Sequence, residues 1–285
     1  MDEENILAPY VPAVRQKAHR LVKRDLVLLK LLSEYGCVDA QRIKAKLWNG
    51  NPVSRAHYRR LSILKKMGMV ENVLGDQGVS LGYRISRLGL RVLNETGTTS
   101  ETTVLQRNYK TQFEHDQLLI DIREILSQSP VVHEFKTEAE IKNEILGGKK
   151  GPVDWRTAPT IPDGAFVYEV PGQRLRVALE LELTQKSRAR YFKILRNHLL
   201  SQRWDMTFYV LRNQALLDHI LPLVAEVKAE DAAVRVARRV NGIYLCLLEN
   251  VLGEGLKARF SNGKKEISLF DLAQNAASNS TSSAT

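Results

Sequence analysis

Three acidic residues in the middle of the chain have the types and the spacing to bind a metal ion: Asp163, Glu180 and Glu182. Residues 177–183 alternate apolar and acidic side chains, which is the period of a strand with one buried face. The two glutamates therefore share one face of this strand. If the preceding apolar run pairs with it as a hairpin through the turn at Pro171-Gly172, Asp163 lies beside both glutamates.

Three unpaired carboxylates at that range repel one another and raise one another's pKa, so the cluster predicts a hard divalent cation that neutralises it. The expected ion is Mg²⁺ or Mn²⁺, held through carboxylate oxygens with water completing the octahedron. A structural role without a metal ion is the alternative. A strand of alternating Leu and Glu can simply have one solvated face, and Pro-Asp is a common turn signal.

Basic residues follow the acidic strand. A helix is expected over residues 185–200, and its three- and four-residue steps place Lys186, Arg190 and Lys193 near one stripe that points phosphate-binding charge at the carboxylates. If the metal site is catalytic, a nearby lysine can lower the pKa of the water that attacks the substrate, or stabilise the negative charge that develops on it. Lys186 and Lys193 are the candidates for this lysine. Tyr191 on the same helix is either a covalent nucleophile or a core aromatic.

Two further basic residues precede the site. Lys149 and Lys150 lie in the glycine- and proline-rich loop 147–159, which adjoins Asp163 in the sequence, so they are predicted to hold the DNA backbone. Weaker candidates for a direct chemical role are His115 and Asp116. The glutamates of the helix expected after residue 137 are weaker candidates for an additional acid. Solvated or structural roles are the simpler interpretation for all of them.

The elements that must position these residues fall into two groups. In the front half, the apolar periodicity predicts helices over 25–36, 39–47 and 53–68, then a two-stranded hairpin and a short helix over 88–93. Three helices and a hairpin in this order resemble a winged helix-turn-helix, in which the third helix enters the major groove of DNA. The alternative is a winged helix used for protein pairing. The predicted DNA contacts are basic residues on the outer faces of the third helix and on the hairpin: Arg55, His57, Arg59, Arg60 and Arg84.

The second half alternates helices and strands, which predicts an α/β sandwich. Its expected helices cover about 110–127, 185–200 and 216–227, and its expected strands include 131–135, 206–211 and 243–248. The polar, threonine-rich stretch 94–103 marks the boundary between the halves.

Pro162-Asp163, then Glu180-Leu181-Glu182 on the following strand, then a basic helix, resemble the core of the PD-(D/E)XK nucleases. From about residue 24 to residue 250, the chain resembles the replication-relaxation family of plasmid and mobile-element proteins, which includes the relaxases of C-type mobilisation systems. The resemblance implies a fold of mixed α+β or α/β class, with an N-terminal winged helix-turn-helix followed by a restriction-endonuclease-like α/β sandwich. It also implies catalytic roles for Asp163, Glu180 and Glu182 and for a lysine.

One position departs from that pattern. The lysine of the motif falls two residues after the second acid, where this chain has Glu182. Either a lysine from the following helix replaces it, or catalysis has been lost.

Composition and charge limit the classes of partner. The net charge is +10, and residues 1–100 carry most of it, with 17 Lys and Arg against 9 Asp and Glu. A polyanion, double-stranded DNA, is the expected partner. No apolar run reaches the roughly 20 residues that span a bilayer and no signal peptide is recognisable, so no membrane association and a cytoplasmic location are expected. Cys37 and Cys246 are predicted to be buried free thiols.

The predicted domains are a basic arm (1–24), a winged helix-turn-helix (25–94), a linker (95–108), a nuclease-like domain (109–271) and a disordered tail (272–285). The leading hypothesis is a mobile-element protein that nicks or relaxes DNA for plasmid mobilisation or replication initiation. The rival hypothesis is a non-catalytic, sequence-specific DNA binder, either a transcriptional regulator or an accessory factor for a relaxase. A homodimer and contacts with other mobilisation proteins are further expectations.

Overall fold

Helices and strands make up most of the computed structural model of the chain, which describes residues 20–48, 55–75, 78–97, 109–146, 160–170, 173–237 and 240–271. Two compact units, Met1–Gln117 and Leu118–Thr285, are distinguished by their internal contacts. Lys149 and Lys150, the basic arm up to residue 19, most of the predicted linker and the predicted tail lie outside the described residues.

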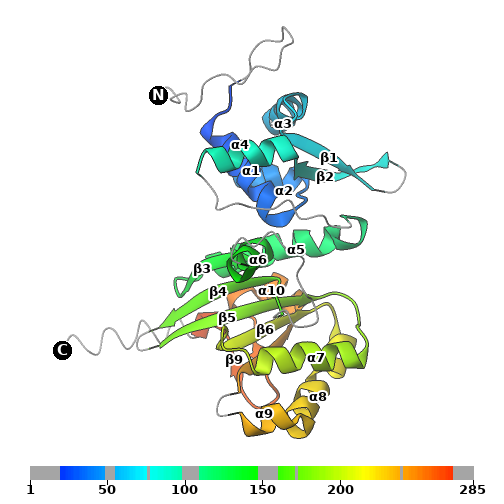
Figure 1. The fold of residues 1–285 in the computed structure, drawn as a ribbon, viewed down its shortest axis with the longest axis vertical. Helices are drawn as coiled ribbons and strands as arrows, with labels where there is room; N and C mark the ends of the chain where they lie inside the picture. The colour runs from blue at the N-terminus through cyan, green and yellow to red at the C-terminus, as the bar shows by residue number, and fades with distance from the viewer. Residues whose placement is uncertain are drawn as a thin grey trace, which may run out of the picture. The chain divides into compact units, whose positions relative to one another are not determined.

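In the described parts of the first unit, three helices are followed by a two-stranded antiparallel sheet and a fourth helix (Figure 1). This order and the first three helices agree with the periodicity of the sequence. The elements are α1 (Lys23–Tyr35), α2 (Ala40–Leu47), α3 (Ala56–Lys66), β1 (Val70–Leu74), β2 (Ser80–Ile85) and α4 (Arg87–Glu95).

Local signals in the sequence explain where these helices begin and end. Gly36 ends α1 with φ of 75°, a backbone conformation that side chains with a Cβ rarely adopt. The Asp39 side chain accepts hydrogen bonds from the backbone N–H groups of Gln41 and Arg42, and so caps the start of α2. Ser86 caps α4 in the same way through Gly89 N–H.

The second unit is built on a seven-stranded mixed sheet, so the chain has a mixed α+β fold (Figure 1). In sheet order, the strands are β3 (Val132–Thr137), β4 (Gly164–Val170), β5 (Gln173–Glu182), β6 (Met206–Leu211), β7 (Gly242–Leu247), β8 (Phe260–Ser261) and β9 (Glu266–Ile267). The helices are α5 (Tyr109–Ser127), α6 (Glu138–Leu146), α7 (Arg188–Leu199), α8 (Gln214–Glu230), α9 (Ala232–Val236) and α10 (Leu248–Glu254), with a 3₁₀ turn at Gly255–Lys257.

The strands β3, β4 and β5 pair antiparallel, and β5, β6 and β7 pair parallel. Two parallel strands need a crossover connection, and α7 and α8 supply the connections of β5 to β6 and of β6 to β7. The strands β8 and β9 were not predicted, because strands of two residues leave no period to detect in a sequence.

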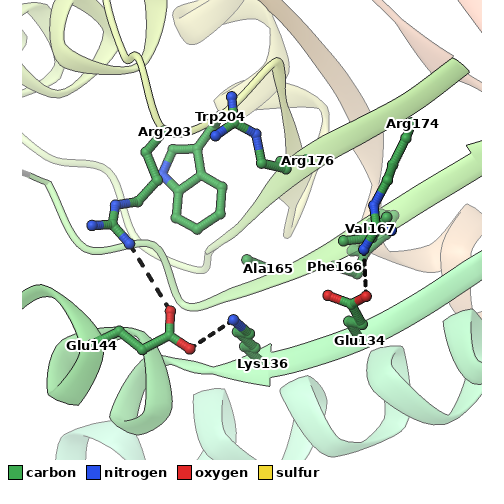
Figure 2. A pocket seen from close by; sticks show the side chains of 10 residues that line it. All are labelled: Glu134, Lys136, Glu144, Ala165, Phe166, Val167, Arg174, Arg176, Arg203 and Trp204. Carbon is green, nitrogen blue, oxygen red and sulfur yellow. Dashed lines mark hydrogen bonds and ion pairs between the residues drawn. The ribbon is translucent and has the colours of Figure 1, made fainter.

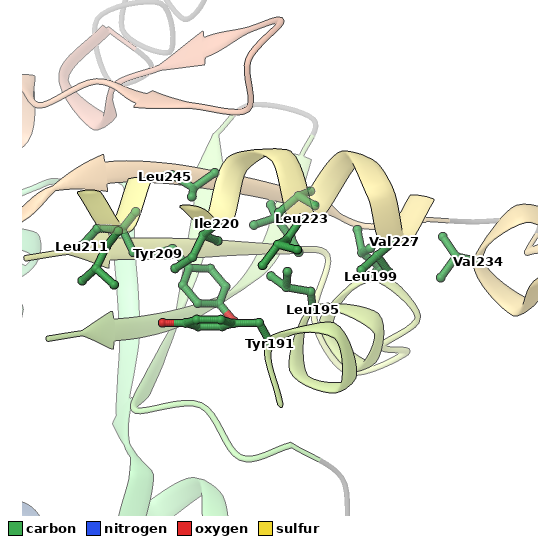
Figure 3. Close-up of a cluster of buried hydrophobic side chains, with 13 residues drawn as sticks. Tyr191, Leu195, Leu199, Tyr209, Leu211, Ile220, Leu223, Val227, Val234 and Leu245 are labelled. Carbon is green, nitrogen blue, oxygen red and sulfur yellow. The ribbon is translucent and has the colours of Figure 1, made fainter. Parts of the chain in front are cut away.

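A hydrophobic core joins α7 and α8 to one face of the sheet (Figure 3). Tyr191 and Leu195 from α7, Tyr209 from β6, and Ile220 and Leu223 from α8 belong to this core. Successive strand residues point to opposite faces, and the register pairs Glu180 with Tyr209. The acidic face of β5 is therefore the face that α7 and α8 cover, and not a solvated face.

The division between the units lies inside α5, beyond the predicted linker. Gln117 shows why the start of this helix belongs to the first unit. Its side-chain Nε2 donates to the Cys37 carbonyl at 2.7 Å, and its Oε1 accepts from the Asp39 backbone N–H at 3.1 Å. Across the described ranges, no helix combines the length and the apolar character needed to cross a membrane.

Candidate functional site

The hairpin of β4 and β5 brings two of the predicted acids together. Gly164 pairs with Leu179, so Asp163 comes next to Glu180 at the end of this antiparallel pair. The Asp163 carboxylate is fixed by the Leu181 backbone N–H, which donates to its Oδ2 at 2.8 Å. The predicted hairpin pairing is thus confirmed, and half-buried Asp163 lies beside the acidic strand.

Glu180 is held by a histidine that the sequence analysis did not single out. Its side chain is 15% exposed, and its Oε1 lies 2.8 Å from His198 Nε2. Burial raises the pKa of Glu180, the hydrogen bond from His198 opposes that rise, and the charge of Asp163 adds to it. The other ring nitrogen of His198 lies 3.3 Å from the Thr207 hydroxyl, so the imidazole is held from two sides.

The spacing on α7 is the signal that could have identified His198. Tyr191, Leu195 and His198 follow one another at four- and three-residue steps and are all buried. A histidine on that stripe must point at the sheet, where Glu180 is the acidic partner.

Glu182 is buried and forms an ion pair with Lys186. Lys186 is the predicted lysine that the structure places at the carboxylates. The expected helix begins later than predicted: Ser187 caps it, and α7 starts at Arg188. Lys186 thus belongs to the turn before the helix, which lets its ammonium group reach back to the strand that precedes it.

Lys193 and Arg190 are both exposed on α7. Neither forms an ion pair with the carboxylates among the described residues. The predicted stripe of Lys186, Arg190 and Lys193 on one helix face is wrong, because Lys186 is not on the helix.

Tyr191 is a core residue. It is 0% exposed, and burial raises its pKa to about 12. Its hydroxyl accepts from the Lys186 backbone N–H at 3.2 Å and donates to the Thr184 carbonyl at 3.4 Å. Of the two interpretations left open by the sequence, this placement favours the core aromatic over a nucleophile, which must reach its substrate.

Tyr209 adds a second phenol that sequence reasoning missed. It pairs with Glu180 across β5 and β6, and its side chain is 2% exposed. Burial raises its pKa well above the usual value, and the nearby charges of Glu180, Glu182 and Asp163 act in the same direction. Its hydroxyl has no hydrogen-bond partner within the described parts of the chain. A neutral hydroxyl donor or acceptor is therefore available beside the carboxylates.

The carboxylates fit Mg²⁺ or Mn²⁺ in the chemistry of their donors, since both are hard ions that take oxygen ligands. Their arrangement fits less well. Among the residues that the structure describes, no group of three His, Cys, Asp or Glu side chains is placed to hold a metal ion. Glu180 and Glu182 instead contact His198 and Lys186, and a metal ion would compete with those contacts.

The glutamates on α6 do not join this cluster. Glu140 accepts hydrogen bonds from the backbone and the hydroxyl of Thr137 at the start of its own helix. Glu144 forms an ion pair with Lys136 at 2.6 Å. Both carboxylates have local structural partners.

In the first unit, two of the predicted DNA-contact residues are exposed. Arg55 precedes α3 and Arg59 lies on it, and both side chains face solvent. The prediction that His57 lies on an outer face is wrong, because His57 is 2% exposed. The adjacent Tyr58 is exposed. His57 packs against Tyr58, with ring centroids 4.0 Å apart, and against Trp48.

Arg60 and Arg84 are engaged in ion pairs. Arg60 binds the buried carboxylate of Asp25, with Nε 2.8 Å from Oδ1, and donates to the Arg20 carbonyl at 2.7 Å. The hydrogen bond with Asp25 raises the pKa of Arg60, so it stays charged and joins α3 to the start of α1. Arg84 pairs with Glu71 across the hairpin, with Nε 2.8 Å from Oε2. Of the five predicted contacts, Arg55 and Arg59 are therefore the best placed for DNA.

Comparisons with known proteins add nothing to this picture: no family model, no curated protein and no solved structure matches the chain.

Proposed function

We propose that this chain is a DNA-processing protein of a mobile element. Its first unit binds double-stranded DNA, and its second unit nicks or relaxes DNA in a reaction that depends on Mg²⁺ or Mn²⁺, for plasmid mobilisation or replication initiation. The observation that carries the proposal is the position of Asp163 next to Glu180 on the β4–β5 hairpin, with Lys186 beside them.

In the second unit, Asp163, Glu180 and the Leu181 carbonyl would hold the ion. When bound, the ion supplies an activated water and neutralises charge that develops on the phosphate. Lys186 keeps a positive charge next to the carboxylates, in place of the lysine that Glu182 replaces. Water is the proposed nucleophile, since Tyr191 is enclosed in the core.

In the first unit, the order of three helices, a hairpin and a helix supports the winged helix interpretation. Arg55 and Arg59 at the start of α3 supply charge for phosphates and base edges. Replacing both with alanine should weaken binding to duplex DNA and reduce its salt dependence. Arg87→Ala, which removes an exposed arginine from α4, is the matched control.

The deciding experiment incubates the purified chain with supercoiled plasmid and Mg²⁺ or Mn²⁺. The parent should convert the plasmid to open-circle or linear DNA, while Asp163→Ala and Glu180→Ala should not. Glu169→Ala removes an exposed carboxylate from the same hairpin and should behave as the parent does. Equal conversion by all four proteins would refute the carboxylate site. If random plasmid stays intact, plasmid DNA from the protein's own element is the required second substrate.

One observation favours the rival function, a non-catalytic DNA binder. Glu180 and Glu182 already have His198 and Lys186 as partners, so both glutamates are engaged within the protein. Such a unit could serve for dimerisation or docking onto a relaxase. Intact duplex binding without any strand cleavage on either substrate would select this function.

A further inference from the structure

A basic cavity lies in the second unit, away from the carboxylates (Figure 2). It has a volume of about 210 Å³. Four cations and two carboxylates form its polar walls. The cations are Lys136 on β3, Arg174 and Arg176 on β5, and Arg203 in the segment before β6, and the carboxylates are Glu134 on β3 and Glu144 on α6. The Trp204 indole forms one wall, and Ala165 and Val167 on β4 lie beneath it.

This cavity opens on the same face of β5 as the carboxylate cluster. Arg174, Arg176, Glu180 and Glu182 all occupy even positions of one strand, whose side chains alternate between faces. Between them, Ala178 packs with Trp204 in a small buried cluster. Four residues separate Arg176 from Glu180, which corresponds to about 13 Å along the strand.

Three cations of the cavity, Lys136, Arg174 and Arg203, form ion pairs with exposed carboxylates. Arg174 pairs with Glu134, and Arg203 reaches Glu144 only at 4.0 Å. Glu144 also receives Lys136 at 2.6 Å, so two cations share one carboxylate. Exposed ion pairs contribute little to the stability of the fold, so an incoming anion can replace the carboxylates in them. Arginine forms stronger, bidentate hydrogen bonds with phosphate oxygens.

Arg176 has a different role from the other two arginines. Its Nε lies 3.2 Å from the Asp205 carboxylate, which is almost fully buried, and its Nη2 donates to the Gln202 carbonyl. Removing Arg176 would therefore take the guanidinium away from a buried carboxylate and disturb the fold. Arg174 and Arg203 can be replaced without that consequence.

The size of the cavity limits what it can bind. Sites for whole cofactors and drug-sized ligands usually measure about 300–1,000 Å³. A single phosphate group fits the smaller volume, and the apolar floor suits the sugar attached to it. One strand of duplex DNA rises about 3.4 Å per nucleotide, so 13 Å is roughly four nucleotides.

We infer that this cavity is a phosphate-binding subsite for the DNA backbone, which begins at Arg176 about four nucleotides from the carboxylate cluster and extends to Arg174 about six nucleotides away. This inference rests on the proposed function, because the carboxylate cluster defines where the reacting strand lies. It adds a second contact on the same strand, made by Arg174 and Arg203.

Binding of DNA without cleavage tests the subsite separately from catalysis. The full chain with Arg55→Ala and Arg59→Ala provides the background, so that binding through α3 does not dominate. A fluorescent 12-nucleotide duplex is titrated in EDTA at several salt concentrations, and fluorescence anisotropy is measured. Adding Arg174→Ala and Arg203→Ala should weaken binding roughly ten-fold at about 0.1 M salt and lower the salt slope by about one for each phosphate that is no longer neutralised.

The matched control is Arg259→Ala. Arg259 is also exposed and also pairs with a glutamate, Glu266, but it lies next to β8 near the opposite edge of the sheet. It should leave the affinity and the salt slope near those of the background. Melting temperatures near that of the background establish that the arginine variants remain folded.

Two results would overturn the subsite. Equal affinity and salt slope in the Arg174→Ala/Arg203→Ala variant and the Arg259→Ala control would remove it. Inorganic phosphate, titrated at constant ionic strength, tests the other source of the same anion. Binding of free phosphate that is abolished in the variant, with unchanged affinity for DNA, would make this a site for a free anion. A parent that binds through the subsite but never cuts plasmid would refute the catalytic proposal alone.

Discussion

Replacing Arg60 with alanine should destabilise the first unit strongly, whereas replacing its neighbour Arg59 should not. Arg60 donates to Asp25, whose side chain is 1% exposed, and also to the Arg20 carbonyl. Arg59 is exposed on the same helix. The two substitutions remove the same charge from adjacent positions, so they separate the role of the ion pair from the effect of charge.

The expected magnitude follows from the burial of Asp25. Removing one partner of a buried ion pair typically costs about 3–5 kcal/mol, because the other charge is left without a partner. Arg60 is 20% exposed, and Asp25 keeps the hydrogen bond from the Val22 backbone N–H at 2.8 Å. Both features place Arg60→Ala near the lower end, at about 3 kcal/mol. For a unit of this size, such a loss lowers the melting temperature by about 12 °C or more.

Differential scanning calorimetry and urea denaturation measure the effect. Arg59→Ala should stay within about 0.5 kcal/mol of the parent. A variant with both Arg60→Ala and Asp25→Ala should be more stable than Arg60→Ala alone, because no buried charge is then left behind.

Melting of Arg60→Ala within about 2 °C of Arg59→Ala would refute the stabilising role of the pair between Arg60 and Asp25. A double variant that is less stable than Arg60→Ala by the full cost of a second, independent substitution would also refute that role. DNA binding should show the reverse order, since Arg59 is the proposed contact and Arg60 is not.

Three further predictions concern the second unit and the thiols. Lys186→Ala should cost about 2–3 kcal/mol in urea denaturation, because a buried carboxylate loses its cation, while exposed Lys193→Ala should change stability by less than about 0.5 kcal/mol. Burial raises the pKa of Glu180, so the stability linked to its proton is present at low pH and is lost as the pH rises from about 4.3 toward the folded pKa. Glu180→Gln should therefore show a shallower loss of stability over that window, and parallel curves for parent and variant would contradict the raised pKa. Burial raises the pKa of the Cys37 and Cys246 thiols to about 12, so neither should react with an aromatic disulfide reagent at neutral pH until denaturant is added.

Much of the architecture could be predicted from local patterns. The apolar period located α1, α2 and β6, and Gly36 and Asp39 marked a helix end and a helix start as expected. The hairpin that places Asp163 beside Glu180 followed from alternation and a turn signal. These features depend on interactions between residues close in sequence, so a single sequence contains them.

The side chains that surround the site could not be predicted in the same way. A period fixes which residues share a face, but a short helix such as α3 can be rotated by one position with little change in its pattern. Tertiary packing buries His57 in the core and leaves Tyr58 exposed. His198 and Tyr209 reach Glu180 from a helix and a strand that are distant in sequence.

The sequence by itself determined most of the succession of helices and strands up to β7, the acidic strand and the concentration of positive charge before residue 100. Only the tertiary structure decided that α7 and α8 cover the acidic face, that Lys186 rather than Lys193 meets the carboxylates, and that Tyr191 is enclosed. The physical reason is that secondary structure follows from hydrogen bonds and side-chain periods along the chain. Burial and the pKa of a group such as Glu180 depend instead on which distant segments exclude water from it.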